Sequence, residues 1–478
     1  MVEATATARW RISPAEFRRP EWVFLLIFLI FGTYCVAAIP LGWNADEPNH
    51  TYRATQIAGG AVLPEVRTGP DGQPSSGGAV PEELAAVFAA TGTIASQVFE
   101  FSVKAEVGQP AGASVFGGSD FRPTSYLDFR NTAIYSPVAY LPQLPAIWVG
   151  GALDWSWSTI LYAARVLGLL VVAAATFFAI RITPVGKWVF LAVGLLPSFV
   201  NQSSSISADV SVLACAALFA ALVLRALADP DPPTAGRWVL LIAVGAALGM
   251  TKVAYGPAVV LLLAVPMVNR SGRGLLRWGI AAGAVVLSLV PTAIWFVLTS
   301  SAAITINPAN DKTAQLAGML ANPIGFVEVI YRTFFTNDLP GMYTGLFGHF
   351  VWATAALPTI YILLAVGALA LSTVAADERE SFLPTGGRVA VAVRSWWVVV
   401  AVGVATVNAA AVYVAFTATA DPVVTGFQGR YLLPSVLLGL VAVAGGGALR
   451  GRAVRIAVVT MSVLALIGAV LEIQLRLY

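Results

Sequence analysis

The chain has 478 residues, of which 58% are hydrophobic and only 11% are charged, and its formal net charge is +3. An ordinary soluble domain carries about 25% charged residues, so this composition excludes a water-soluble protein and indicates a membrane protein. The basic residues concentrate in short loops between apolar runs, which gives no indication of nucleic-acid binding. Cys35 and Cys215 both lie in apolar runs and offer no metal-ligand or disulfide spacing.

The apolar runs predict an all-α integral membrane protein, because a helix of about 20 apolar residues crosses the hydrocarbon core of a bilayer. Short cytoplasmic loops are rich in Lys and Arg, and placing every basic loop inside gives eleven spans. We expect these spans near residues 21–41, 160–181, 187–204, 207–227, 237–252, 254–268, 276–299, 350–374, 395–417, 431–449 and 454–474. The Ala/Val/Gly/Arg bias indicates a bacterium of high genomic GC content, so the expected location is the bacterial cytoplasmic (inner) membrane.

The spans divide the chain into a cytoplasmic N-terminus (1–20), an N-terminal membrane module (21–299) and C-terminal membrane helices (350–478). The N-terminal module contains a first extracytoplasmic loop at 42–134, with a Gly/Pro/Ser-rich stretch and a short helix near 81–101.

Two further segments accompany the spans. Residues 135–151 are apolar but interrupted by three prolines. If this segment crossed the membrane every later loop would be inverted, so we expect a re-entrant or interfacial helix; a twelve-span topology is the alternative. Residues 300–349 form a second extracytoplasmic loop, in which we expect short interfacial helices.

The densest polar cluster follows the first span, where Asp46, Glu47, His50 and Arg53 fall within eight residues. Adjacent carboxylates can take a proton from a hydroxyl group or hold a divalent cation such as Mg, Mn or Ca. A helix beginning at Pro48 brings the His and Arg side chains toward the same side. In the alternative interpretation, the cluster is a solvated loop in which an Asp or Asn caps that helix.

Other candidates lie at the outer ends of the predicted spans. Asp209, at the start of the fourth span, either stabilises the helix dipole or faces the site built by the first loop. Lys252, Arg332 and Arg430, the last followed by Tyr431, are cations on the side where the topology predicts few. Such residues are suited to hold the phosphate of a lipid-linked substrate. A second histidine, at 349, is more typical of a hydrogen-bonded structural residue.

Five segments in chain order form a recognisable pattern. It resembles a family of bacterial polytopic membrane proteins that carries a domain of unknown function and is similar to GT-C glycosyltransferases. The resemblance covers nearly the whole chain and is carried by Asp46-Glu47-Pro48-Asn49-His50, Tyr135-Ser136-Pro137-Val138-Ala139-Tyr140-Leu141-Pro142, Pro197 to Asp209, Gly345-Leu346-Phe347-Gly348 and Gln428-Gly429-Arg430-Tyr431-Leu432-Leu433-Pro434.

The resemblance implies transfer of a sugar from a polyprenyl-phosphate donor to an acceptor outside the cytoplasm, with an acidic residue of the first outer loop near the reaction centre. Carried onto this chain, that residue is Asp46, with Glu47 beside it. The resemblance also implies that Tyr135 and Tyr140 line the lipid-phosphate groove and that Asp209 approaches the same cavity. The chain departs from the pattern in two respects. His349 replaces an expected aromatic residue, and we expect no large periplasmic domain after the last span.

We therefore expect a membrane glycosyltransferase that transfers a hexose or pentose to a cell-envelope glycan or lipid acceptor. Asp46 would deprotonate the acceptor, assisted by Glu47 or a divalent cation, while Arg430 with Lys252 or Arg332 would stabilise the departing phosphate. Two alternatives are a transporter of lipid-linked saccharides, which would hold the same phosphate, and a non-catalytic subunit of envelope assembly. The transferase, the transporter and the assembly subunit all need membrane lipids as partners. The transferase and the transporter also need the charged side chains to meet at one outward-facing pocket.

Overall fold

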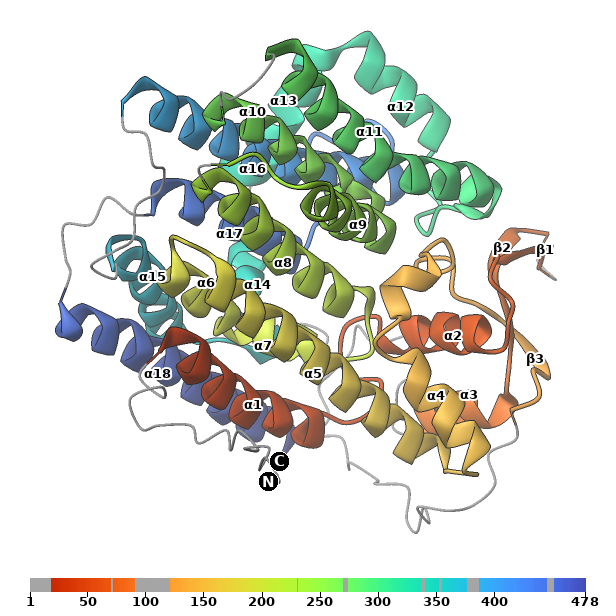
Figure 1. Ribbon diagram of the computed structural model, residues 1–478. Helices are drawn as coiled ribbons and strands as arrows, with labels where there is room; N and C mark the ends of the chain where they lie inside the picture. Colours follow the sequence, from red (N-terminus) through yellow and green to blue (C-terminus); the bar gives the residue numbers. More distant parts are fainter. Residues whose placement is uncertain are drawn as a thin grey trace, which may run out of the picture.

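The long helices of the computed structural model run side by side in one bundle (Figure 1). The structure describes residues 19–69, 72–90, 121–229, 231–269, 274–336, 340–351, 355–375, 387–444 and 451–478. Within these residues, six helices are long and apolar enough to cross a membrane. They are α1 (Pro20–Ala38), α5 (Trp157–Ile182), α8 (Ala208–Ala228), α11 (Gly274–Thr299), α16 (Arg388–Ala415) and α18 (Arg452–Leu477). The predicted helical architecture is therefore confirmed for the bundle, while the expected cytoplasmic N-terminus lies almost entirely outside the described residues.

Shorter apolar helices complete the bundle. They are α9 (Ala235–Thr251), η3 (Val253–Ala264) with α10 (Val265–Val268), α15 (Thr359–Val374), and η6 (Gly429–Leu432) with α17 (Leu433–Val443). The span expected at 187–204 is divided into α6 (Lys187–Gly194) and α7 (Pro197–Ser203). Pro197 has no N–H to continue the helical hydrogen bonds, and its ring blocks the preceding turn, so α6 ends before it. The total of eleven spans stays a prediction.

Helix α8 lies at the centre of the bundle. Its most apolar stretch is 78% buried, whereas that of α11 is only 28% buried and leaves most of its apolar surface on the outside. Ser207 caps α8 by accepting a hydrogen bond from the Asp209 backbone N–H, which satisfies one of the free amides of the first turn. The first turn of the most buried of the six long helices therefore carries a carboxylate.

The first loop folds over one end of the bundle. It contains α2 (Glu47–Ala58), α3 (Glu82–Ala90) and a three-stranded antiparallel sheet of β1 (Glu65–Thr68), β2 (Pro74–Val80) and β3 (Ser125–Asp128), with β2 in the centre. Figure 1 shows α2 and this sheet together at the right-hand end of the molecule. The all-α prediction omitted the sheet, because β2 has a Gly- and Ser-rich sequence with little β propensity. Residues 91–101 of the expected helix lie outside the described residues.

The apolar segment 135–151 forms two short helices, η2 (Pro137–Tyr140) and α4 (Leu144–Ala152). The nine residues of α4 rise about 13 Å, less than half of the roughly 30 Å hydrocarbon core, so this helix cannot cross a membrane by itself. It packs against α2 and α5, while η2 packs against α8 and α9. The segment therefore joins the first loop to the buried centre of the bundle.

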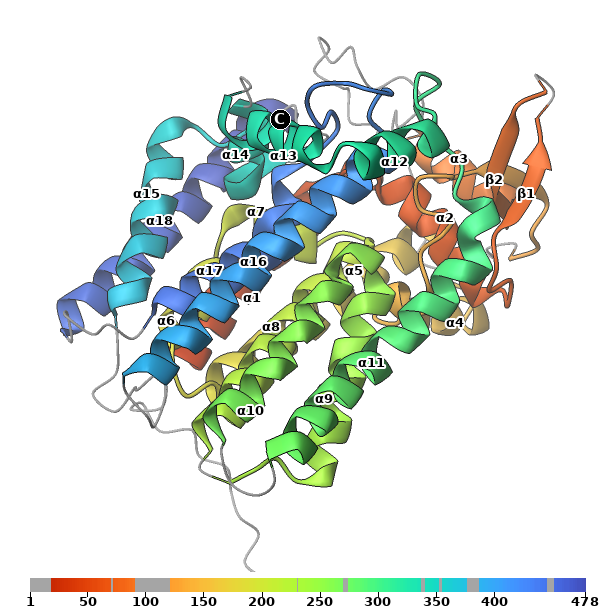
Figure 2. The same cartoon turned by 90° about the horizontal axis from the view of Figure 1, so that it is seen from above.

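The second loop consists of short helices, as expected. They are η4 (Ser300–Ala302), α12 (Lys312–Ala321), α13 (Pro323–Tyr331), the π-helix η5 (Arg332–Thr336) and α14 (Pro340–Gly348), followed by the paired strands β4 (His349–Phe350) and β5 (Ala355–Ala356). Figure 2 shows α12, α13 and α14 across the end of the bundle where α16 ends. Large apolar side chains stand exposed along α12, α13 and η5 at intervals of three or four residues, and we call them the apolar stripe: Leu316, Leu320, Ile324, Val327, Tyr331 and Phe335.

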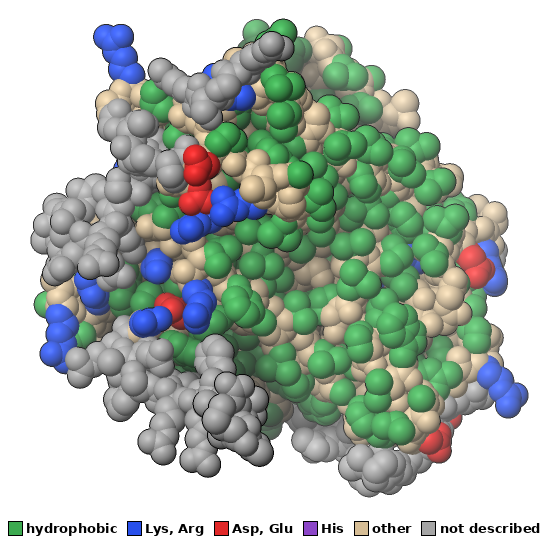
Figure 3. Space-filling model, viewed as in Figure 1, with side chains coloured by type: hydrophobic (Ala, Val, Ile, Leu, Met, Phe, Trp, Pro, Cys, Tyr) green, Lys and Arg blue, Asp and Glu red, His purple; other side chains and the backbone are tan. Residues whose placement is uncertain are grey.

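The two ends of the bundle differ in charge. The loops described above all lie at the end where α1 finishes and α5 and α8 begin. The helix ends away from these loops carry many basic residues: Arg181, Lys187, Arg225, Arg237, Arg277, Arg388, Arg452 and Arg455. In Figure 3 most of the visible Lys and Arg side chains gather on the left, away from α2 and the sheet. The bundle therefore has a basic end and a loop-covered end.

Candidate functional site

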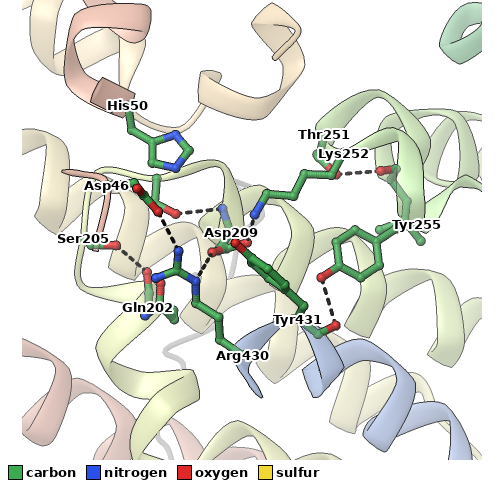
Figure 4. Close-up of polar contacts among 12 residues, drawn as sticks. Asp46, His50, Gln202, Ser205, Asp209, Thr251, Lys252, Tyr255, Arg430 and Tyr431 are labelled. Atoms are coloured by element: carbon green, nitrogen blue, oxygen red, sulfur yellow. Dashed lines mark hydrogen bonds and ion pairs between the residues drawn. The ribbon is translucent and has the colours of Figure 1, made fainter. Parts of the chain in front are cut away.

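Four charged side chains from separate parts of the chain meet at the loop-covered end (Figure 4). One guanidinium nitrogen of Arg430 lies 2.8 Å from a carboxylate oxygen of Asp46, and its Nε lies 3.4 Å from Oδ2 of Asp209. The Nζ of Lys252 lies 2.5 Å from the other oxygen of Asp209. We call Asp46, Arg430, Asp209 and Lys252 the charged cluster, in which carboxylates and cations alternate.

The charged cluster is buried except at one member. The side chains of Arg430 and Asp209 are each 8% exposed and that of Lys252 is 10% exposed, whereas that of Asp46 is 23% exposed. Removing a charge from water costs several kcal/mol per ion, which only close pairing offsets. Two carboxylates and two cations balance each other, and Asp46 is the carboxylate that a molecule entering from outside would meet first.

Asp46 occupies an unusual backbone conformation at the start of α2. Its φ of 61° is in the left-handed region, which is sterically unfavourable for a residue with a side chain and is often found at functional sites. The carboxylate does not cap α2; it accepts hydrogen bonds from Arg430 and, over 3.1 Å, from the Asn131 amide. The geometry thus differs from the solvated, capping interpretation of this loop. Asn131 in turn accepts a hydrogen bond from Asn49.

The remaining members are placed by helix ends. Asp209 lies in the first turn of α8. Lys252 lies between α9 and η3 and has an extended backbone, so the side chain of Lys252 points away from the helix axis and reaches Asp209. The ammonium of Lys252 stands 5.6 Å from the ring centre of Tyr135 and 5.0 Å from that of Tyr431. Both contacts are within the range of a cation–π interaction. The aromatic rings thus hold the ammonium in place while leaving its charge unneutralised on that side.

Arg430 reaches the charged cluster because Gly429 packs directly against α14. A Cβ at position 429 would collide with the backbone of Met342 and Leu346. It would also collide with the backbone of Gly345, the residue of α14 that faces Gly429. The segments around Gly345 and Gly429, two of the five behind the resemblance, therefore touch each other. Ser198 of α7 also donates a hydrogen bond to the Leu346 carbonyl and joins a third segment to them.

His50, Tyr135 and Tyr140 form an aromatic group beside the charged cluster. The His50 ring stacks on Tyr135 at a centroid distance of 5.6 Å and an interplanar angle of 8°, and its Nδ1 lies 2.8 Å from the Tyr140 hydroxyl. Burial lowers the pKa of His50 to about 3, and the positive charge of Lys252 acts in the same direction. Burial also raises the pKa of Tyr135 to about 12, so at neutral pH both groups are uncharged.

Glu47 has a different role from its neighbour Asp46. Its two carboxylate oxygens bind Arg165 at 2.7 and 2.5 Å and accept backbone N–H groups of Gly42 and Ile206. The side chains of Glu47 and Arg165 are only 1% and 0% exposed. The structure therefore corrects the expectation that Glu47 assists Asp46, because both oxygens are engaged with Arg165. The pair instead fixes the turn that carries Asp46.

Two of the basic candidate residues, Arg53 and Arg332, lie outside the charged cluster. Arg53 is buried and donates to the carbonyls of Tyr135 and Val62, so it supports the backbone beneath the aromatic group. Burial lowers the pKa of the Arg53 guanidinium to about 10. Arg332 is exposed on η5 and pairs at 2.5 Å with Glu328, one turn before it. The structure brings neither arginine to the charged cluster, because each is held by local partners.

The carboxylates of the site are paired with basic side chains. Among the described residues, no group of three or more His, Cys, Asp or Glu side chains is arranged to hold a metal. Mg²⁺, Mn²⁺ and Ca²⁺ require several oxygen ligands. The oxygens of Asp46 and Asp209 face the cations of the charged cluster, and those of Glu47 face Arg165. The divalent cation stays a prediction.

Sequence reasoning missed Asn131 and Arg165. Arg165 gave a signal that could have been used, since an ionisable residue inside a predicted span is costly and usually has a buried partner. Asn131 lies in a polar loop among many polar residues and gave no such signal.

Comparison with known proteins gives one match. The model of a family described as "Predicted membrane protein (DUF2142)" matches residues 29–438. No curated protein and no solved structure is significantly similar to the chain. The match includes every member of the charged cluster and the aromatic group, and it covers most of the chain. The chain therefore belongs to the DUF2142 family of membrane proteins.

Proposed function

We propose that this protein is a GT-C-like glycosyltransferase of the bacterial cytoplasmic membrane, which transfers a sugar from a polyprenyl-phosphate-linked donor to an envelope glycan or lipid acceptor. The observation that carries the proposal is the contact between Asp46 and Arg430. A partly exposed carboxylate stands 2.8 Å from a buried guanidinium, which shares Asp209 with Lys252. One carboxylate able to accept a proton thus adjoins two cations able to hold a phosphate.

The charged cluster suits an exchange of anions. In the structure, the guanidinium of Arg430 binds the carboxylate of Asp46. An incoming phosphate can replace it, because a guanidinium binds phosphate oxygens through its planar fork as well as it binds a carboxylate. Asp46 is then released from Arg430 but keeps its hydrogen bond from Asn131. Binding of the donor therefore produces the free carboxylate that the reaction needs.

In the transfer step, Asp46 takes the proton of the acceptor hydroxyl while the hydroxyl oxygen forms a bond to the anomeric carbon of the sugar. The bond between that carbon and the phosphate oxygen breaks, and its electron pair stays on the phosphate. Arg430 and Lys252 stabilise this developing negative charge, and they do so strongly because they are buried. Asp209 keeps both cations in position between turnovers.

The charge of the two ends supports a reaction on the extracytoplasmic side. Basic loops face the cytoplasm in most membrane proteins, and the charged cluster lies at the end opposite the basic one. The site then faces the compartment in which envelope glycans are assembled. Polyprenyl phosphates present their sugars to enzymes in that compartment without a nucleotide.

Aromatic contacts from the charged cluster toward the apolar stripe support a lipid-linked donor. Tyr431 packs edge-on against Phe427 at 5.7 Å, and Phe427 packs edge-on against Phe334 at 5.5 Å. Phe334 lies in η5 next to the last residue of the stripe, Phe335. An isoprenoid chain held along these rings would place its phosphate near Lys252 and Arg430.

The broken helix α6–α7 favours one alternative, a transporter of lipid-linked saccharides. Discontinuous helices line the substrate sites of many transporters, and Ser198 at the start of α7 is joined to α14 beside Arg430. A transporter moves the donor across the membrane and leaves it unchanged. A transferase converts it into free polyprenyl phosphate, which distinguishes the two.

The test uses the full chain in lipid nanodiscs, a panel of polyprenyl-phosphate hexoses and pentoses, and envelope glycan and lipid fractions as acceptors. We expect release of polyprenyl phosphate with at least one donor. Asp46→Asn should lower the rate by about 100-fold or more, while Asp128→Asn, a substitution of a paired carboxylate elsewhere in the first loop, should leave it unchanged. Unimpaired release by Asp46→Asn, or no consumption of any donor, would overturn the proposal.

A further inference from the structure

His50 and Tyr140 form a buried hydrogen-bonded pair whose protons can be placed. Nδ1 of His50 lies 2.8 Å from the hydroxyl oxygen of Tyr140, and the two residues are 3% and 0% exposed. Within the described part of the chain, the Tyr140 hydroxyl has no other hydrogen-bond partner. Because it carries one proton and is shielded from water, that proton needs His50 as its acceptor.

This requirement selects one form of the imidazole. If Tyr140 donates, Nδ1 of His50 must carry a lone pair, so the single proton of a neutral ring lies on Nε2. A charged imidazolium would leave the Tyr140 proton without an acceptor. It would also place a third positive charge beside Lys252 and Arg430 in a buried region, which the charges of Asp46 and Asp209 only partly offset.

The ring is also fixed in orientation. Tyr135 stacks on its face with an interplanar angle of 8°, and two hydrogen bonds from Arg53, of 3.1 and 3.0 Å, hold the Tyr135 carbonyl. Figure 4 shows the His50 ring above Asp46, with the side chain of Lys252 to its right. Among the described residues, Nε2 has no hydrogen-bond partner. A donor therefore stands beside the charged cluster without an acceptor.

We infer that Tyr140 holds His50 as the neutral Nε2–H tautomer, so that His50 donates a hydrogen bond to a phosphate oxygen bound in the charged cluster and does not act as a base. A neutral donor adds a hydrogen bond to an anion without the desolvation cost of another buried cation. His50 then contacts the ligand, and Tyr140 is a positioning residue. The identity of the ligand rests on the proposed function, but the tautomer does not.

The tautomer can be measured directly, because the chain contains only two histidines, His50 and His349. The full chain is labelled with ¹⁵N in its imidazole rings, and His349→Gln leaves one set of signals. We expect Nδ1 to be unprotonated and Nε2 to be protonated from pH 6 to 8, as judged by ¹⁵N shifts and couplings to the ring protons. Tyr140→Phe should give a mixture of the two neutral tautomers. An Nδ1–H tautomer or an imidazolium in the wild-type chain at pH 7 would overturn the inference.

The donor role is tested with two substitutions of similar size. The amide nitrogen of Gln takes nearly the place of Nε2, whereas that of Asn takes nearly the place of Nδ1. We expect His50→Gln to bind polyprenyl phosphate within about tenfold of wild type and His50→Asn to lose about 100-fold, since hydrogen bonds to charged groups contribute about 1.5–3 kcal/mol. Equal affinities of the two variants, with unfolding temperatures matched, would remove the donor role.

Adding polyprenyl phosphate to the labelled chain separates this inference from the proposed reaction. We expect the Nε2 signal to shift on saturation and the Nδ1 signal to stay nearly constant. An unchanged Nε2 signal overturns the donor role. A shifted signal with no turnover of any sugar donor supports the donor role and overturns the transferase.

Discussion

The guanidinium of Arg430 lies 2.8 Å from the carboxylate of Asp46, although 384 positions separate them in the chain. Asp46 begins the first loop, whereas Arg430 lies in η6 just before α17. The contact joins the two ends of the family match and closes the charged cluster around Asp209. Its members therefore depend on each other's position, and substitutions of each have distinct expected effects.

Substitution of Arg430 should weaken phosphate binding. Arg430→Met removes a buried cation and leaves Asp209 with one partner, so we expect polyprenyl phosphate affinity to fall by about 2–5 kcal/mol. Arg332→Met is the matched control, because Arg332 is exposed and pairs with Glu328, one helical turn before it. It should change affinity by less than about 1 kcal/mol. Isothermal titration in nanodiscs measures both, and equal losses would remove the distinction between the two arginines.

Gly429→Ala should displace Arg430 without removing any charge. The added Cβ would collide with backbone atoms of α14, which cannot move as a flexible side chain does. We expect a destabilisation of about 1–3 kcal/mol and a loss of polyprenyl phosphate binding similar to that of Arg430→Met. Gly318→Ala, in an exposed position of α12 with no atom near the new Cβ, is the control and should bind normally. Normal binding by Gly429→Ala would show that the packing against α14 does not position Arg430.

The buried pair of Glu47 and Arg165 should dominate stability. Replacing one partner leaves a buried charge uncompensated, so Glu47→Gln and Arg165→Met should each destabilise the fold by about 3–5 kcal/mol. The double variant should lose less stability than the sum of the losses of the two single variants, because neither buried charge then remains without its partner. Thermal unfolding in detergent measures this. Asp46→Asn, which alters the partly exposed carboxylate, should leave the unfolding temperature within a few degrees of wild type; a large decrease would assign Asp46 a mainly structural role.

His50 should make stability depend on pH below neutrality. Its pKa is lowered from 6.5 to about 3 by burial, so between these values the unfolded chain binds a proton that the folded chain does not. The contribution of His50 to stability is therefore complete above pH 6.5 and decreases as the pH falls toward 3, with a limiting slope of about 1.4 kcal/mol per pH unit. The stability difference between wild type and His50→Gln should be constant above pH 7 and shrink in acid. A difference independent of pH from 7 to 4.5 would contradict the neutral buried imidazole.

The apolar stripe should contact lipid. Ile324 and Phe335 are 82% and 75% exposed, and they lie in short helices at the loop-covered end. Nitroxide labels at these two positions in nanodiscs should be more accessible to oxygen than to a water-soluble nickel chelate, as is typical of helices in the membrane interface. A label at Thr68, on the exposed strand β1, should show the reverse. Greater nickel accessibility at Ile324 and Phe335 would place the stripe in water.

Much of the architecture could be predicted from hydropathy and the distribution of basic loops, and single members of the site could be found because they are charged residues in unusual places. Asp209, Lys252 and Arg430 each stood out at a helix end. The difference between Asp46 and Glu47 could not be predicted, because two adjacent acids have the same sequence signal. The left-handed backbone of Asp46 turns one carboxylate toward Arg430 and leaves the other facing Arg165.

The sheet and the burial of Arg53 could not be predicted from the sequence either. The strands are short, and the central one is rich in Gly and Ser, so we expect their pairing to depend on the packing of β2 against α2. Arg53 falls at the helical spacing of a ligand, but the carbonyls that hold it come from residues 62 and 135. Which partner an arginine finds depends on contacts between distant segments.

The order of the charged cluster along the chain has a consequence for biogenesis. Asp46, Asp209 and Lys252 are synthesised and inserted well before Arg430, which arrives only with η6. A growing chain that stops before residue 430 therefore holds two acids and one cation, with the outer carboxylate unpaired. The charged cluster is completed only when η6 has been made, so the ion pair between Asp46 and Arg430 cannot form in a growing chain that still lacks residue 430.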